Sequence, residues 1–97
     1  MIRARHKINK ELTAKIVQIL KRHGIKKAGI FGSYAREDYN KRSDVDILIE
    51  FNGSLLTLVG IELELKKSLK RNVDLLTYRG INHLLKKRIL KEEIQIL

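Results

Sequence analysis

The sequence contains no cysteine, no proline and no tryptophan, and its aromatic residues are three tyrosines and two phenylalanines. Without cysteine, the chain has neither a disulfide framework nor a thiolate metal site. So few aromatic residues provide no stacking platform for single-stranded nucleic acid. The apolar runs are far shorter than a membrane span, and no N-terminal signal pattern is visible, so we expect a cytoplasmic protein without a membrane partner.

Charged residues make up 33% of the 97 residues and hydrophobic residues 43%, a balance typical of one folded domain, which we place at residues 1–97. The net charge of +10 is unevenly spread, because residues 1–27 and 66–91 are strongly basic while the acidic residues concentrate in residues 36–65. Basic flanks favour an anionic partner: a nucleotide, a nucleic acid or an acidic protein surface. A thermophile-like surface rich in Lys, Glu and Arg explains the same charges without a partner.

Hydrophobic periodicity predicts a small α/β domain. We expect helices at residues 9–23, 33–38, 54–71 and 81–93, and strands at residues 25–31, 44–51 and 72–78. The C-terminal IQIL fits either an extension of the last helix or a short edge strand. The predicted fold is therefore a three-stranded mixed sheet covered by helices, with four strands if the C-terminus adds one.

Helix caps and apolar faces give more detailed expectations. Asn9 is a candidate N-cap of the first helix. The helix at residues 54–71 is expected to bury one face, made of Leu55, Leu58, Val59 and Leu65. The helix at residues 81–93 is expected to present Ile81, Leu84, Leu85 and Ile89 on one face.

Three aspartates stand at the start of two apolar strands. The strand period of two places Asp44 and Asp46 on one face, where their like charges require either a proton or a cation between them. Hard divalent cations such as Mg²⁺ favour carboxylate oxygens. Asp74 begins the next apolar strand in the same style, as NVDLL after SDVDIL, and supplies a third carboxylate if the two strands are neighbours.

Gly32 and Ser33 lie between the first predicted strand and the short helix that follows it. A glycine lets the backbone turn tightly and approach a ligand, and a helix N-terminus favours a phosphate. A lone Gly-Ser is mostly a turn, and a lone Asp-x-Asp is more often a solvated face or a cap than a ligand. The combination of turn, Asp-x-Asp and third aspartate predicts a site that aligns a triphosphate with an attacking hydroxyl.

These residues resemble a known family. Gly32-Ser33, ten intervening residues and Asp44-Val45-Asp46 fit the Gly-Ser-x10-Asp-x-Asp signature of the DNA polymerase beta-like nucleotidyltransferases. The stretches GSYAR…SDVDILIEF and VDLLT are similar to the minimal nucleotidyltransferases, and the likeness spans about residues 25–95. The resemblance implies a small nucleotidyltransferase fold.

The resemblance also implies roles for individual residues. Asp44 and Asp46 would hold two Mg²⁺ ions, and Asp74 would touch the catalytic ion and help to deprotonate the acceptor hydroxyl. Gly32 and Ser33 would hold the β- and γ-phosphates of ATP, the substrate. Arg36 matches the arginine after GSxA and would either contact phosphate or brace the loop. Glu37 departs from the family, which commonly has glycine there.

The chain has no room for a second domain that grips the acceptor, so we expect the acceptor to be a docked macromolecule or a second copy of this chain. The resemblance implies a toxin–antitoxin pair, in which this chain transfers AMP to a tyrosine of a HEPN-type toxin encoded nearby. Two alternatives stay open: an antitoxin that neutralises its toxin by binding alone, and a basic nucleic-acid-binding module.

Overall fold

The computed structural model describes residues 10–36, 39–40 and 42–97, so the candidate cap Asn9 and the departing residue Glu37 lie outside the described residues. In chain order the elements are α1 (Lys10–Arg22), β1 (Ala28–Phe31), α2 (Ser33–Arg36), β2 (Val45–Ile49), α3 (Leu55–Leu69), β3 (Val73–Thr77), α4 (His83–Glu92) and β4 (Ile94–Gln95). Each expected helix and strand is present with slightly different bounds, and the C-terminal segment forms a strand rather than extending the helix.

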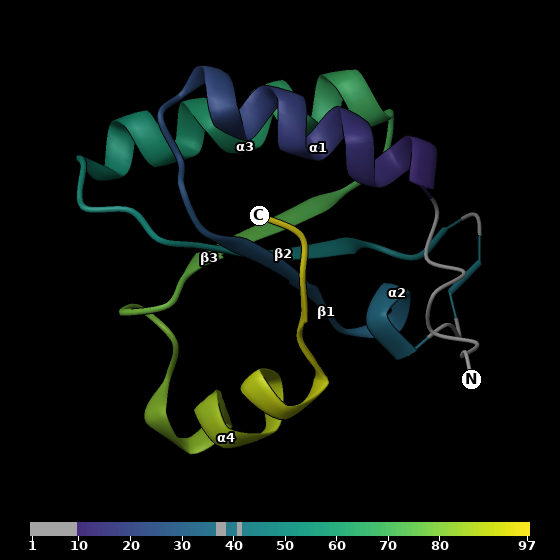
Figure 1. The fold of residues 1–97 in the computed structure, drawn as a ribbon, viewed down its shortest axis with the longest axis vertical. Helices are drawn as coiled ribbons and strands as arrows, with labels where there is room; N and C mark the ends of the chain where they lie inside the picture. Colours follow the sequence, from purple (N-terminus) through teal and green to yellow (C-terminus); the bar gives the residue numbers. More distant parts are fainter. Residues whose placement is uncertain (1–9, 37–38, 41) are drawn as a thin grey trace.

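The four strands form one mixed sheet in the order β3-β2-β1-β4. Strands β2 and β3 are parallel, because α3 carries the chain back between them, whereas β1 pairs antiparallel with both β2 and β4. Helices α1 and α3 cover one face of the sheet and α4 lies on the other (Figure 1). The α/β prediction is confirmed in its four-stranded form.

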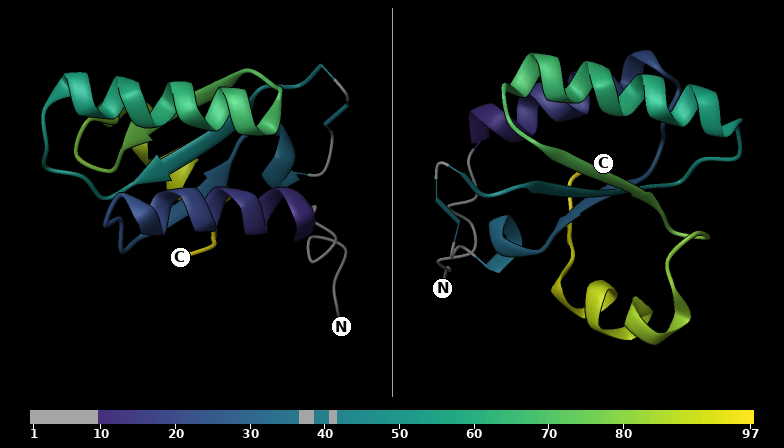
Figure 2. Two further views of the ribbon diagram at one scale, coloured as in Figure 1. Left: turned by 90° about the horizontal axis from the view of Figure 1, so that it is seen from above. Right: turned by 180° about the vertical axis from the view of Figure 1, so that it is seen from behind.

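The main core lies between the sheet and the pair α1 and α3, which run side by side (Figure 2). Strand β2 contributes Val45, Ile47 and Ile49, whose side chains are completely buried. At the end of α1, Arg22 Nη2 and His23 Nε2 each lie 2.7 Å from a carboxylate oxygen of Glu64 on α3. None of the helices in the described residues has the length and apolarity needed to cross a bilayer.

The predicted buried face of α3 is wrong for two of its members. Leu55 is 74% exposed and Val59 is 43% exposed, whereas Ile61, Leu65 and Leu69 are buried. Apolar residues occur on every side of α3, so their spacing alone does not identify the packed side. Contact with α1 and the sheet selects the side that carries residues 61, 65 and 69.

The predicted buried face of α4 is also wrong in part, and the difference leaves part of the sheet uncovered. Ile81 and Ile89 are buried with Phe31 and Leu48 in a second, smaller core, but Leu84 and Leu85 are exposed. Helix α4 is short and rests on only part of its sheet face. The starts of β2 and β3 therefore remain uncovered on that side.

Candidate active site

The uncovered part of the sheet carries the aspartates. Alternation along β2 directs Val45 and Ile47 toward the main core and Asp46 toward the α4 side. In the parallel pairing of β2 and β3, Asp46 lies directly beside Asp74. Asp44 precedes β2 by one residue and is exposed. The two strands are therefore neighbours, as expected, and Asp74 lies beside Asp46, whereas a shared site of all three aspartates stays a prediction.

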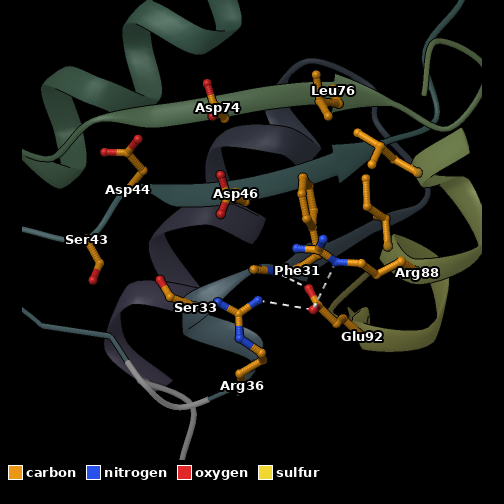
Figure 3. A pocket seen from close by; sticks show the side chains of 13 residues that line it. Phe31, Ser33, Arg36, Ser43, Asp44, Asp46, Asp74, Leu76, Arg88 and Glu92 are labelled. Carbon is orange, nitrogen blue, oxygen red and sulfur yellow. Dashed lines mark hydrogen bonds and ion pairs between the residues drawn. The ribbon is translucent and has the colours of Figure 1, made fainter. Parts of the chain in front are cut away.

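A pocket of about 510 Å³ opens over this part of the sheet (Figure 3). Strand β1, the turn after it, the start of β2, strand β3 and helix α4 all contribute to its wall. All six residues expected from the sequence line it, namely Gly32, Ser33, Arg36, Asp44, Asp46 and Asp74. Leu76, Leu85 and Ile89 form an apolar wall on the side of α4.

Gly32 is required by its backbone conformation and by its neighbour Asp46. Its φ angle is +74°, a left-handed conformation that L side chains rarely adopt. The register of β1 and β2 places Phe31 opposite Asp46, so the turn that follows Phe31 lies against the Asp46 carboxylate. A Cβ atom on Gly32 would lie 2.1 Å from Asp46 Oδ2. From the sequence, we expect the backbone at this glycine to approach a ligand; in the structure it lies close to the Asp46 carboxylate.

The turn also begins a single helical turn. The N–H groups of Ala35 and Arg36 donate to the Gly32 carbonyl oxygen, both at 3.0 Å. Ser33 is the first residue of α2 and lines the pocket. Four residues give a helix little macrodipole, so the hydroxyl and local N–H groups of the turn offer the main anion contacts there.

Negative charge is concentrated around Asp46. Its pKa is raised from 3.8 to about 6, chiefly by burial. The nearby charges of Asp74 and Asp44 and a hydrogen bond with Asp74 act on this pKa in the same direction, while the positive charge of Arg36 opposes them. Like-charged carboxylates of this kind bind a proton more tightly unless a cation is placed among them. The electrostatics therefore favour a divalent cation at this position.

The three aspartates are chemically suitable ligands for Mg²⁺, but their side chains are not arranged around one ion position in this structure. Three carboxylates offer the hard oxygen ligands that Mg²⁺ prefers. Among the described residues, however, no three His, Cys, Asp or Glu side chains are grouped as ligands of one ion. Asp46 and Asp74 are adjacent, whereas the carboxylate of Asp44 points away from them (Figure 3). Asp44 is exposed, so packing does not fix its side chain in this orientation.

Glu92, at the end of α4, is the site residue that the sequence did not indicate. Its Oε1 accepts a hydrogen bond from the Gly32 N–H at 3.1 Å, and its Oε2 accepts one from Arg36 Nη1 at 3.0 Å. Arg88, one helical turn earlier, has Nε 3.9 Å from the same Oε2. Arg36 thus joins α2 to the end of α4 (Figure 3), and its two expected roles, phosphate contact and bracing of the loop, stay predictions.

Comparisons with known proteins extend over nearly the whole chain. Residues 13–97 match the nucleotidyltransferase domain family. A protein of Methanocaldococcus jannaschii assigned as a protein adenylyltransferase is 51% identical over 89 residues, 90% of this chain and 96% of the relative. The solved structure of a protein described as a minimal nucleotidyltransferase is 30% identical and has a TM-score of 0.75, covering 88% of this chain and 89% of its own.

A further solved structure is the complex of a tri-AMPylated HEPN toxin of Shewanella oneidensis with an MNT antitoxin. It contains a chain that is 20% identical to this one, with a TM-score of 0.74 over 91% of this chain and 71% of that chain. At this identity the likeness establishes the fold alone.

Proposed function

The chain belongs to the nucleotidyltransferase domain family, among its protein adenylyltransferases, and from this we propose that it transfers AMP from ATP to a hydroxyl group of a partner protein. The family predicted from the Gly-Ser and Asp-x-Asp motifs is confirmed. The observation that carries the proposed reaction is the meeting of the Gly32-Ser33 turn with Asp44, Asp46 and Asp74 around one pocket.

The reaction balances without an oxidant or a further co-reactant. The acceptor oxygen forms a bond to the α-phosphorus of ATP, the bond from that phosphorus to the bridging oxygen breaks, and pyrophosphate leaves. The acceptor proton passes to a carboxylate, for which Asp74 is the candidate because it is exposed at the pocket, whereas its neighbour Asp46 is half-buried. Asp44 and Asp46 would hold Mg²⁺, which supplies charge neutralisation of the phosphates when bound.

The remaining residues bind and orient the nucleotide. Ser33 would contact the phosphates through its hydroxyl and the local N–H groups of the turn. Arg36 adds a positive charge beside them. Leu76, Leu85 and Ile89 provide an apolar wall against which a nucleoside can pack.

We propose a HEPN-type toxin encoded near this gene as the acceptor. The support is twofold. The chain has the fold found in the complex with the AMPylated toxin, and its relative of 51% identity is assigned as an enzyme that adenylylates proteins. Tyrosine is the proposed acceptor side chain.

The test is to mix this chain with that toxin and MgATP and to measure the intact mass of both proteins. We expect the toxin to gain one or more AMP units, and Asp44→Asn to abolish the gain. Glu50→Gln is the matched control, because Glu50 is an exposed acid that follows β2 and lies outside the pocket. A normal gain with Asp44→Asn would contradict the proposed site.

A second candidate function is neutralisation of the toxin by binding alone. The favouring observation is a group of exposed apolar side chains on α3, none of which lines the pocket, formed by Leu55, Leu56, Val59 and Leu63. A tight complex with no mass gain on either chain would support this alternative. It predicts that Asp44→Asn still protects cells from the toxin.

A further inference from the structure

One carboxylate joins three parts of the pocket. Glu92 accepts hydrogen bonds from the Gly32 N–H and from Arg36, and it lies within ion-pair distance of Arg88. Its side chain is only 19% exposed, whereas that of Arg36 is 43% exposed and that of Arg88 is 73% exposed. The carboxylate is thus the enclosed centre of the group, and the two arginines reach it from the solvent side.

The position of Glu92 is unfavourable unless these partners compensate it. An acidic residue in the last turn of a helix faces the negative end of the helix dipole. Asp44, Asp46 and Asp74 line the same pocket and add further negative charge. The contacts with Arg36 and the Gly32 N–H are therefore needed to stabilise the carboxylate.

The backbone beside Glu92 is tied to the strand that leads to Gly32. Strand β4 begins two residues after Glu92 and pairs with β1, with Ile94 beside Ile30. The N–H groups of Ile96 and Leu97 both donate to the carbonyl oxygen of Ala28, the first residue of β1. Gly32 follows directly after the same strand. Sheet pairing therefore fixes residue 92 next to residue 32, which makes the carboxylate a built part of the pocket.

From this we propose that Glu92 is a positioning residue for the nucleotide, which acts by holding the Arg36 guanidinium group and the Gly32 turn in place. The inference rests on the proposed function, because it concerns the same phosphate site. A guanidinium group has five N–H donors, so a bond to Glu92 is compatible with further bonds to phosphate. Glu92 also competes with Asp46 for Arg36, whose charge already acts on that aspartate.

Removal of the Glu92 charge therefore has a defined consequence. Without it, Arg36 is drawn toward the remaining carboxylates of Asp46 and Asp74, where it opposes metal binding and turns away from the phosphates. We expect Glu92→Gln to weaken nucleotide binding about tenfold, the effect of losing one charge-assisted hydrogen bond. Glutamine keeps the size of the side chain and an oxygen for the Gly32 N–H.

The experiment is calorimetric titration of the chain with a non-hydrolysable ATP analogue and Mg²⁺. The double variant Arg36→Gln with Glu92→Gln should bind no more weakly than Arg36→Gln alone, because the two residues act as one unit. Glu93→Gln is the matched control: Glu93 is the next residue, is similarly part-buried, and accepts a hydrogen bond from Tyr78 outside this pocket. We expect it to bind like the wild type.

Several results would overturn the inference. Unchanged or tighter binding by Glu92→Gln would show that the carboxylate is inert or competes with the phosphates. Additive losses in the double variant would show that Glu92 does not act through Arg36. If the wild-type chain does not bind the analogue, the proposed function itself is wrong. If the wild type binds it and only the results for the Glu92 variants differ from those expected, the inference about Glu92 alone is wrong. Glu92→Asp, which retains the charge but is shorter, should lose affinity too, and thermal unfolding checks that each variant is folded.

Discussion

At the scale of single residues, Gly32 and Gly60 form a matched pair for the same substitution. Gly32→Ala forces a side chain into the +74° conformation and against Asp46 Oδ2, so we expect the free energy of unfolding to fall by about 1–2 kcal/mol or more, with loss of AMP transfer. Gly60 lies inside α3, and among the described residues beyond its own stretch of helix no atom lies within 4 Å of the point that a methyl carbon would occupy, so Gly60→Ala should raise stability by roughly 0.5–1 kcal/mol. Urea unfolding measures both, and equal effects would contradict this account.

Asp46 provides a prediction of pH dependence. Its pKa is raised to about 6 in the folded protein from an ordinary 3.8, so the folded state binds the proton more tightly than the unfolded chain. The wild type should therefore lose stability, relative to Asp46→Asn, as the pH rises from about 4 to about 6. Allowing for partial exposure, we expect the variant to be more stable by about 1–2 kcal/mol above about pH 7.

The comparison is made by urea unfolding in the presence of EDTA, at about pH 4 and at about pH 7.5. The two proteins should be close in stability at the lower pH and differ at the higher one. An equal difference in unfolding free energy at both pH values would mean that the folded state does not disfavour the ionised form of Asp46. The same variant should be inactive, so that stability and activity change in opposite directions.

The six residues expected at the site line one pocket, and five of them could be found from the sequence because they lie in one local motif, whereas Asp74 is found because its strand repeats the pattern of the first. Glu92 could not be found in this way, because its role depends on the pairing of β4 with β1, which brings residue 92 to residue 32. The sequence did hold one clue: Glu92 is an acid in the last turn of a helix rich in Lys and Arg. Such an acid is disfavoured by the helix dipole and so indicates a partner elsewhere in the fold.

At the scale of elements, the sequence of α3 does not determine which side of the helix packs against the core. Leu65 is completely buried, whereas Leu56 is 83% exposed. We expect Leu65→Ala to cost about 2–4 kcal/mol of unfolding free energy, because it leaves a cavity in the core. Leu56→Ala should change stability by no more than about 0.5 kcal/mol. Denaturant unfolding of the two variants tests the packed side, and similar losses would show that Leu56 is also part of a core.

Strands are easier to predict here than helix faces. In β2 the apolar Val45, Ile47 and Ile49 alternate with Asp46, so one face is identified by polarity alone. In α3 no such contrast exists, because leucines and valine occur on the exposed side as well. The sequence does not decide the state of the final segment, because four residues are too few to distinguish a helical from a strand period, and hydrogen bonding to Ala28 and its neighbours makes it a strand.

At the scale of the whole molecule, the pocket joins segments that are distant in the chain. The turn at Gly32, the aspartates of β2 and β3, and Glu92 belong to separate elements. A ligand that binds all of them is bound by the folded state only, and it stabilises that state by an amount that grows with its concentration. At about a hundred times its dissociation constant, the gain is about 2.7 kcal/mol.

The net charge of +10 offers a competing source of stabilisation, because any polyanion can bind a basic surface. The two sources differ in their requirements. If the proposed function holds, binding in the pocket requires Mg²⁺ and the carboxylates, so the rise in melting temperature with ATP should disappear in EDTA and in Asp44→Asn. Binding to the basic flanks needs neither, and it weakens steeply with salt through release of counterions.

Melting curves at two salt concentrations therefore separate the pocket from the basic surface. We expect MgATP to raise the melting temperature of the wild type at both about 50 mM and about 200 mM salt, because in the proposed site a metal and a few pocket residues, rather than many exposed lysines, would hold the phosphates. A rise that survives EDTA but vanishes at the higher salt concentration would instead indicate a general anion-binding surface, and the nucleotide would then owe its affinity to the charge of the chain rather than to Asp44, Asp46 and Asp74.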